Sequence, residues 1–188
     1  LESPMLTHDE FDRLCAIDRV GFKTQRFVCA YDRDAAEGAL EAALTELCID
    51  VEQAVRDGVN LVVLTDRTAE GEVPIPSLLS LAAVHNHLIA VGLRTDADLI
   101  VETGDAMRAH DFACLVGYSA SGIYPYAAHE CIRDLCERGE ISIPGDEAVA
   151  NYDRAVVVGI TSIMSKMGIS TMQGYHSAQI FEILGLDD

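Results

Sequence analysis

The sequence predicts an α/β fold in which a mostly parallel sheet is flanked by helices. Three observations support this prediction. Short runs of branched apolar residues alternate with segments whose apolar residues recur at three and four positions, the spacing of a helix face. Most helical segments end at a glycine, and polar turns lead from each strand into the next helix. This order is typical of βαβ units, whose crossovers place successive strands in parallel.

The first elements are marked by a capping signal and a glycine stop. A threonine followed three residues later by a glutamate is a capping box, which predicts a short helix over 7–17. Residues 27–31 have the composition of a strand. A regular apolar spacing then predicts a helix from Asp34 to Asp57, and Gly58 supplies its left-handed stop.

The next strand and helix are the clearest in the chain. Residues 60–64 form an uninterrupted apolar run, which favours a strand covered on both faces of a parallel sheet. A loop containing Pro74 and Pro76 follows. Ser77 is then predicted to cap a helix from Leu78 to Val91, which stops at the following glycine.

Two further strand and helix pairs follow the same rhythm. The sequence predicts strands over 98–101 and 121–124 and helices over 106–116 and 126–138, each helix closing at the next glycine. The pattern therefore gives successive βα units that share one sheet.

The last third is predicted to be helical. Asn151 is expected to cap a helix over 152–167. Because 188 residues suffice for one ordinary core, we expect a single domain over 1–188. Segments 1–32 and 151–188 are expected to protrude from it as arms.

Charge excludes several classes of partner. The chain has 31 acidic and 13 basic side chains and a formal charge of −18, which repels nucleic-acid phosphates and anionic lipid headgroups. No apolar run approaches the ~20 residues of a spanning helix, and no basic-then-apolar leader opens the chain. These observations predict a cytoplasmic protein without nucleic-acid or membrane partners.

The cysteines and the first residue also constrain the interpretation. Six cysteines lack the C-x-x-C spacing of zinc and redox sites, so we expect separate thiols. The chain begins at Leu1, which is read as the start of an excerpt or of a processed chain.

Polar residues at the predicted strand ends are the candidate contact residues. The carboxyl ends of parallel strands share one rim, where ligands or neighbouring domains bind. Together with one lysine at the end of the last helix, the interface or channel candidates are Asp66, Arg67, Glu102, Thr103, Asp105 and Lys166. An aspartate–arginine pair either orients a charged ligand or bridges two chain segments. Asp105 also stands where the cap of the helix over 106–116 belongs.

A metal site is the alternative interpretation. His85 and His87 are two residues apart, but on a helix such residues point about 200° from each other. The alternative function is a small metal-dependent hydrolase using His85, His87, His110 and Asp105. Neither a dinucleotide-binding glycine motif nor a Walker loop is found in the sequence.

Several sequence blocks carry a resemblance to a known family. They are LTDR at 64–67, AAVHNHLI at 82–89, VETGDA at 101–106, SKMGIST at 165–171 and SAQIFE at 177–182. With the residues between them, these blocks resemble the later part of the central region of the glutamate synthase large subunit. The resemblance extends over essentially the whole chain.

The resemblance implies a role in nitrogen assimilation and glutamate biosynthesis. In that family a glutaminase domain releases ammonia, a central α/β domain connects it onward, and a flavin-binding domain joins the ammonia to 2-oxoglutarate. This chain would be a connecting domain that helps to shape the ammonia path, with no complete active site and no catalytic residue. The resemblance places FMN and an iron–sulfur cluster in the parent enzyme, outside this chain. The electron donor (NADPH, NADH or ferredoxin), a homo-oligomeric assembly and a freestanding flavoprotein are left open.

The chain departs from the family pattern at six positions. The family usually has arginine, glutamate and a second histidine at the first three, glycine at the fourth, and arginine and glycine at the last two. The residues that stand there in this chain are Met107, Arg108, Asp111, Ser119, His176 and Ser177.

Overall fold

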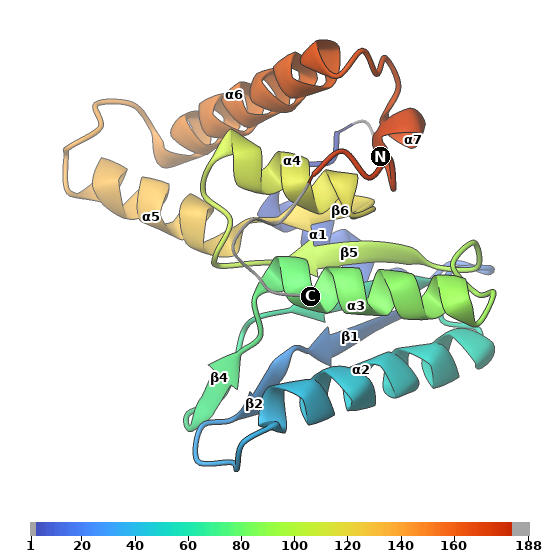
Figure 1. Cartoon of the computed structure of the whole chain (residues 1–188). Coiled ribbons are helices and arrows are strands. Elements are labelled where there is room, and N and C mark those ends of the chain that lie inside the picture. The colour runs from blue at the N-terminus through green and yellow to red at the C-terminus, as the bar shows by residue number, and fades with distance from the viewer. Residues whose placement is uncertain (1–2, 182–188) are drawn as a thin grey trace.

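The computed structural model describes residues 3–181, and its centre is a four-stranded parallel sheet (Figure 1). The strands are β1 (Thr24–Val28), β3 (Leu61–Thr65), β5 (Asp98–Glu102) and β6 (Gly122–Tyr124). They lie side by side in chain order, β1-β3-β5-β6, and every neighbouring pair is parallel. The predicted fold class is therefore confirmed.

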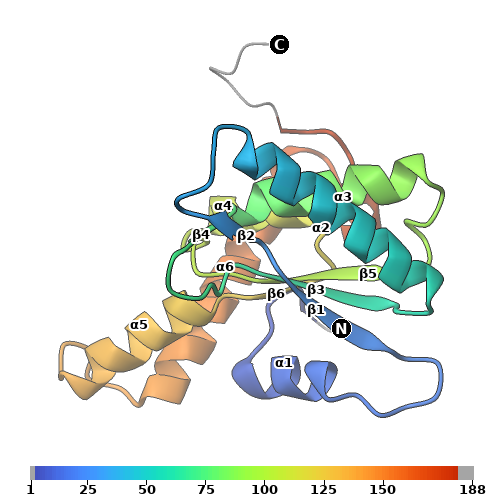
Figure 2. The same ribbon diagram turned by 90° about the horizontal axis from the view of Figure 1, so that it is seen from below.

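Helices cover both faces of this sheet (Figure 2). On one face lie α2 (Ala39–Arg56), α3 (Ser77–Ala90) and α4 (Ala109–Gly117), which connect successive strands. On the other face lies α1 (His8–Cys15), which begins at the predicted capping box. The chain therefore builds a sheet with one long helical layer and one short helical cover.

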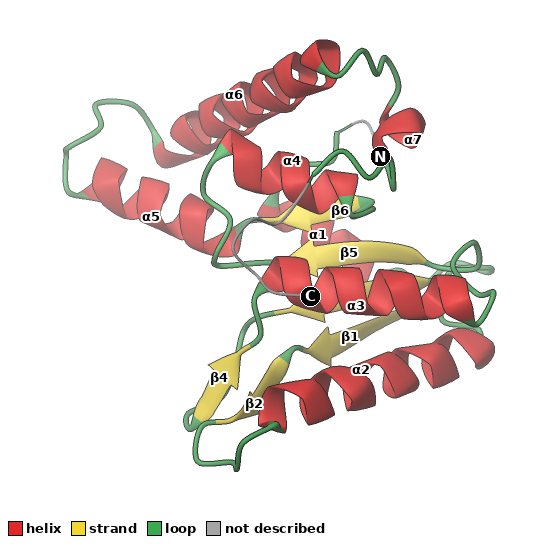
Figure 3. Ribbon diagram, in the orientation of Figure 1, coloured by secondary structure: helices red, strands yellow, loops and turns green. Residues whose placement is uncertain are grey.

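The remaining elements extend the molecule on two sides (Figure 3). Two short strands, β2 (Ala30–Asp32) and β4 (Glu72–Pro74), pair antiparallel beyond the end of the main sheet. Helices α5 (Tyr126–Glu137) and α6 (Gly145–Lys166) pack against each other, and the short helix α7 (Met172–Tyr175) follows. Among the helices of residues 3–181, none combines the length and the hydropathy that a membrane crossing requires.

Alternation along the strands separates two hydrophobic cores. Val62 and Leu64 of β3 point into the main core beneath α2, α3 and α4. Leu61 and Val63 point to the opposite face, where they meet Phe11 of α1. All five β3 residues are buried, as the uninterrupted apolar run predicts.

Two predicted boundaries in the first half are wrong for identifiable reasons. The strand expected over 27–31 is divided between β1 and β2. The helix expected over 34–57 begins only at Ala39, because Gly38 has a left-handed φ of 89° that a helix interior does not accept. The loop predicted around Pro74 and Pro76 contains β4, a short strand in which a proline is tolerated.

Later boundaries also differ from the predictions. The helix expected over 106–116 spans Ala109–Gly117, since Asp111 accepts hydrogen bonds from the Met107 and Arg108 amides at its start. The helix expected to begin after Asn151 begins at Gly145, so Asn151 lies inside α6 and is not its cap.

The expected arms at 1–32 and 151–188 are also wrong for the described residues. Strand β1 is part of the main sheet, and α6 packs on α4 and α5. By contrast, the stops at Gly58, Gly92 and Gly139 are confirmed, with φ values of 89°, 75° and 75°.

Candidate functional site

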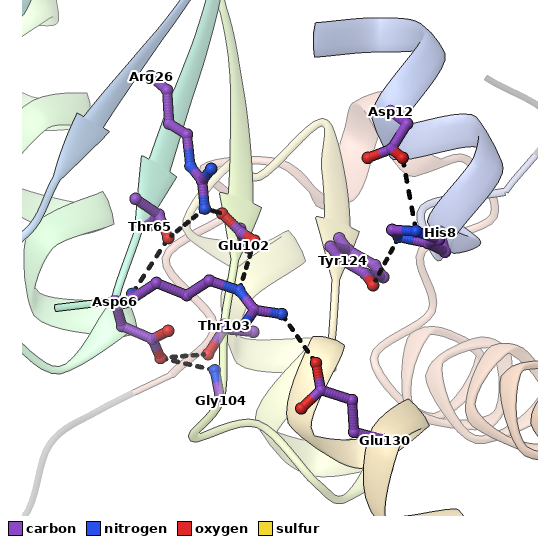
Figure 4. A network of polar contacts seen from close by, with 11 residues as sticks. His8, Asp12, Arg26, Thr65, Asp66, Glu102, Thr103, Gly104, Tyr124 and Glu130 are labelled. Atoms are coloured by element: carbon purple, nitrogen blue, oxygen red, sulfur yellow. Dashed lines mark hydrogen bonds and ion pairs between the residues drawn. The ribbon is translucent and has the colours of Figure 1, made fainter. Parts of the chain in front are cut away.

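The structure brings most predicted candidates together at the carboxyl ends of the strands (Figure 4). Glu102 ends β5, and Asp66 and Arg67 follow β3 directly. Thr103 and Asp105 come next in the chain after β5. Because the strands are parallel and in register, these five side chains share one edge of the sheet. We call this set the carboxyl-end network.

Glu102 is the buried centre of this network, with only 3% of its surface exposed. One of its oxygens accepts a hydrogen bond from Arg26 Nη2, and the other accepts from Arg67 Nε at 2.9 Å. Arg26 Nη2 and the Arg67 amide also donate to Thr65 Oγ1, at 3.4 and 3.1 Å. A buried carboxylate requires such compensation, and two guanidinium groups provide it.

Arg67 connects this centre to the start of α5. Its Nη2 donates to Glu130 at 2.9 Å, and its guanidinium lies 3.6 Å from the centroid of the Tyr126 ring, a cation–π contact. Burial opposes its charge, but hydrogen bonds to Glu130 and Glu102 outweigh burial and raise the Arg67 pKa. Arg67 therefore joins β3, β5 and α5 through one side chain.

Asp66 holds the loop that follows β5. Its Oδ2 accepts from the Gly104 amide at 2.6 Å and lies 3.3 Å from Thr103 Oγ1. Its Oδ1 is buried and has no hydrogen-bond partner among residues 3–181. Burial, followed by the nearby Asp66 charge, raises the pKa of Tyr126 to about 12. Any side chain at Gly104 would meet Tyr126 Oη, which is 2.7 Å from the Cβ position.

Asp105 caps a different helix from the one predicted. Its Oδ2 accepts from the Ser77 amide at 2.9 Å, at the first residue of α3. Its Oδ1 accepts from Thr103 Oγ1 at 2.6 Å. The predicted capping of the helix over 106–116 by Asp105 is therefore wrong, and so is the capping of α3 by Ser77. A carboxylate at a helix amino end is favoured by the helix dipole.

A second group of polar residues extends from this edge to α1 (Figure 4). Tyr124 Oη lies 3.1 Å from His8 Nδ1, and His8 Nε2 lies 3.5 Å from Asp12. Sequence reasoning missed Arg26, Thr65 and Tyr124. Thr65 and Tyr124 lie at the ends of predicted strands, which was an available signal, whereas Arg26 required the correct bounds of β1.

The remaining candidates lie elsewhere. Lys166 is exposed at the end of α6 and does not belong to the carboxyl-end network. His85 Nδ1 accepts from Arg94, His87 Nε2 lies 2.7 Å from Glu52, and His110 Nε2 lies 3.6 Å from Cys114. The four residues of the hydrolase alternative thus have separate partners. Residues 3–181 contain no group of three or more metal-binding side chains.

The described residues do not fit the cofactors of the resembled family. The six cysteines are dispersed, and at least two are buried, which does not suit an iron–sulfur cluster. At the carboxyl ends of the strands, the polar side chains of Arg26, Arg67, Glu102 and Glu130 are paired with one another. On the α1 face, Phe11 stacks on Tyr124 with ring centroids 4.7 Å apart.

Comparison with known proteins gives one family and several relatives. Residues 1–187 match the family model described as "Glutamate synthase central domain". The large chain of the NADPH glutamate synthase of Bacillus subtilis is 39% identical over 187 residues, covering 99% of this chain and 12% of the relative. The chloroplastic ferredoxin-dependent glutamate synthase of Spinacia oleracea is 40% identical over 200 residues, covering 99% and 12%. The NADH glutamate synthase of Schizosaccharomyces pombe is 35% identical over 193 residues, covering 100% and 9%.

Solved structures show similarity at the level of the fold alone. A flavocytochrome b2 variant with sulfite bound has a TM-score of 0.57 and 16% identity, covering 97% of this chain and 46% of that chain. DHODH from Eimeria tenella, in complex with ferulenol, has a TM-score of 0.52 and 13% identity, covering 84% and 38%.

Proposed function

This chain belongs to the glutamate synthase central domain family, and we propose that it serves as a connecting domain that helps to shape the ammonia path in a glutamate synthase. The observation that supports the proposal is the difference between the share of this chain and the share of the relative that the match covers. The match includes 99% of this chain but only 12% of the Bacillus subtilis large chain. The chain is thus similar to one segment of a much longer protein, whose other segments would supply the reactive groups.

The carboxyl-end network supports a structural role. Glu102, Arg67 and Asp66 each hold two or more chain segments in place. Their hydrogen-bonding capacity is largely used within the domain, so they are suited to keep an interface rigid. Rigid placement matters for ammonia because a route open to water would allow its protonation and escape.

The proposed partners are the glutaminase domain and the FMN-binding synthase domain of the parent enzyme. Both FMN and the iron–sulfur cluster would belong to those other segments. The names of the relatives include NADPH, NADH and ferredoxin, so the electron donor of this parent is left open. A single domain and a cytoplasmic location stay predictions.

The exposed side chains of the carboxyl-end network and of its ion-pair partners are the proposed contact points. Side-chain exposure is 40% for Arg67, 45% for Arg26 and 60% for Glu130, against 3% for Glu102. Asp66, Arg67, Glu102, Thr103, Asp105 and Lys166 stay the interface candidates, with Arg67 and Lys166 as exposed contacts and the buried Glu102 and Thr103 as residues that hold the neighbouring segments in place. Arg67 is the one whose charge is both anchored and accessible.

Substitution of Arg67 in the parent enzyme tests the connecting role. Arg67→Met removes the bonds to Glu102 and Glu130 while Arg26 still holds Glu102. We expect glutamine-driven glutamate formation to fall by about 10- to 100-fold, since a misplacement of about 1 Å can cost about 100-fold. Ammonium-driven formation should be retained, and free ammonia should appear in the medium. Arg138→Met, which removes an exposed arginine just after α5, is the matched control.

Two results would contradict the proposal. The first is a parallel loss of glutamine-driven and ammonium-driven rates without ammonia release. The second is turnover of glutamine or 2-oxoglutarate by the isolated 188-residue chain. Thermal unfolding of each variant identifies any loss that comes from misfolding.

A further inference from the structure

A polar cavity lies at the opposite end of the sheet from the carboxyl-end network. It has a volume of about 530 Å³ and is bordered by the loop before β5, the residues before β6, and the segment after α7. The charged and polar side chains on which the inference depends are Arg94, Asp98, His85, Ser119, Ser121 and Ser177.

Arg94 is a fixed cation at this cavity. Its Nε donates to His85 Nδ1 at 2.8 Å, its Nη1 to the Ala97 carbonyl at 2.6 Å, and its Nη2 to the Ser119 carbonyl at 3.0 Å. All three acceptors are neutral, and a guanidinium has five N–H donors. Within residues 3–181, two donors are therefore unused and no carboxylate lies in ion-pair contact with Arg94. Burial lowers the Arg94 pKa, so a bound anion would be favoured there.

His85 and two serines hold Arg94 in place. Because His85 Nδ1 accepts from Arg94, His85 Nε2 carries the proton and donates to Ser177 Oγ at 2.9 Å. Ser177 Oγ lies 2.7 Å from Ser119 Oγ. Burial, with the Arg94 charge as second cause, lowers the pKa of His85 to about 4, so its ring is neutral at pH 7. His85 is therefore an orienting group for Arg94, without a free nitrogen to act as a base.

The backbone at both serines is strained. Ser119 and Ser177 have φ values of 73° and 57°, in the left-handed region that residues with a side chain rarely adopt. Such strain persists where the surroundings impose it, and it concentrates at ligand sites. The cavity wall is thus built from a hydrogen-bonded but strained set of residues.

Asp98 supplies the opposite charge at the same cavity. It is exposed at the start of β5, and its Oδ1 accepts from Ser121 Oγ at 2.7 Å. Its charge acts to raise the Arg94 pKa, yet the two groups do not form one of the ion pairs among residues 3–181. A cation and an anion therefore face the cavity with space between them.

We propose that this cavity binds a small zwitterion, an α-amino acid, with its carboxylate on Arg94 and its ammonium group on Asp98. A simple anion is disfavoured because Asp96 also borders the cavity, and a simple cation is disfavoured by Arg94. The hydroxyl groups of the wall suit a short polar side chain. This site is separate from the carboxyl-end network and does not depend on the proposed connecting role.

Calorimetric titration of the 188-residue chain with matched ligands tests the proposal. The probes are L-asparagine, L-glutamine and L-serine, together with two analogues of asparagine: succinamate, which lacks the ammonium group, and 3-aminopropanamide, which lacks the carboxylate. Each analogue should bind about 10- to 100-fold more weakly than asparagine, the usual effect of losing one charged hydrogen bond. Amide NMR shifts should concentrate at residues 94–98 and 119–121.

Two isosteric variants extend the test, one at the cavity and one on α2 as its control. Asp98→Asn retains the acceptor for Ser121 but removes the charge; it should weaken asparagine binding by a similar factor and leave succinamate binding unchanged. Asp50→Asn removes an exposed carboxylate of α2 and should bind like the unmodified chain. The proposal is overturned if none of the three amino acids binds, if asparagine and both analogues bind equally, or if the two variants behave alike.

Discussion

At the scale of single residues, Glu102 shows what the sequence could and could not predict. Its place after an apolar strand was sufficient to predict that it lies at the sheet edge with Asp66 and Arg67. Its partner Arg26 was missed, because the first strand was predicted over 27–31 and Arg26 fell outside it. Side-chain partners from distant strands depend on register, which periodicity alone does not give.

The serines at 119 and 177 lead to a prediction at the same scale. Because a left-handed φ is cheaper for glycine than for alanine, Ser119→Gly should be more stable than Ser119→Ala by about 1 kcal/mol. Both variants lose the hydroxyl, so their difference isolates the backbone term. The same order is expected at Ser177, and chemical unfolding measures both pairs.

Ser162 offers a matched control for that comparison. It lies inside α6, where alanine is preferred over glycine by about 1 kcal/mol, so the order of the two variants should reverse. Equal stabilities of Gly and Ala at 119 and 177 would show that the left-handed backbone contributes no strain.

At the scale of helices and strands, the sequence pattern predicted the elements whose signal lies within a few neighbouring residues. β3 and the α1 capping box were correctly placed because continuous apolar runs and caps are short-range features. The pair β2 and β4 was missed because each strand has three residues and its partner lies about forty residues away. The start of α6 was misplaced because asparagine often caps helices, whereas Asn151 lies within this one.

The contact between α4 and α6 gives a prediction for an element pair. A methyl group on Gly159 would lie 2.5 Å from Ala109 Cβ, closer than two carbons approach. Gly159→Ala should therefore lower the free energy of unfolding by about 1–3 kcal/mol, despite its better helix propensity. The double variant Gly159→Ala with Ala109→Gly should recover most of the loss. A stabilised single variant would contradict the close packing of α4 on α6.

At the scale of the whole molecule, α1 completes the fold by covering one face of the sheet. Phe11 is 4% exposed and packs against the sheet residues Leu61, Val63 and Ile100. Phe11→Ala should lower the free energy of unfolding by about 3–5 kcal/mol, the usual effect of removing a buried aromatic ring. Phe22→Ala is the control, since Phe22 is 44% exposed and should cost about 0.5 kcal/mol or less. Similar losses in both variants would mean that α1 does not form this cover.

Helix α3 spans the distance between the two ends of the domain. Its first amide is held by Asp105 at one end of the sheet, His85 projects from its middle, and its carboxyl end leads within four residues to Arg94. With 14 residues it is a rod about 21 Å long. Helix α3 therefore joins the loop that carries Asp105 to the segment that carries Arg94 within one rigid element, so the two ends of the domain keep a fixed separation.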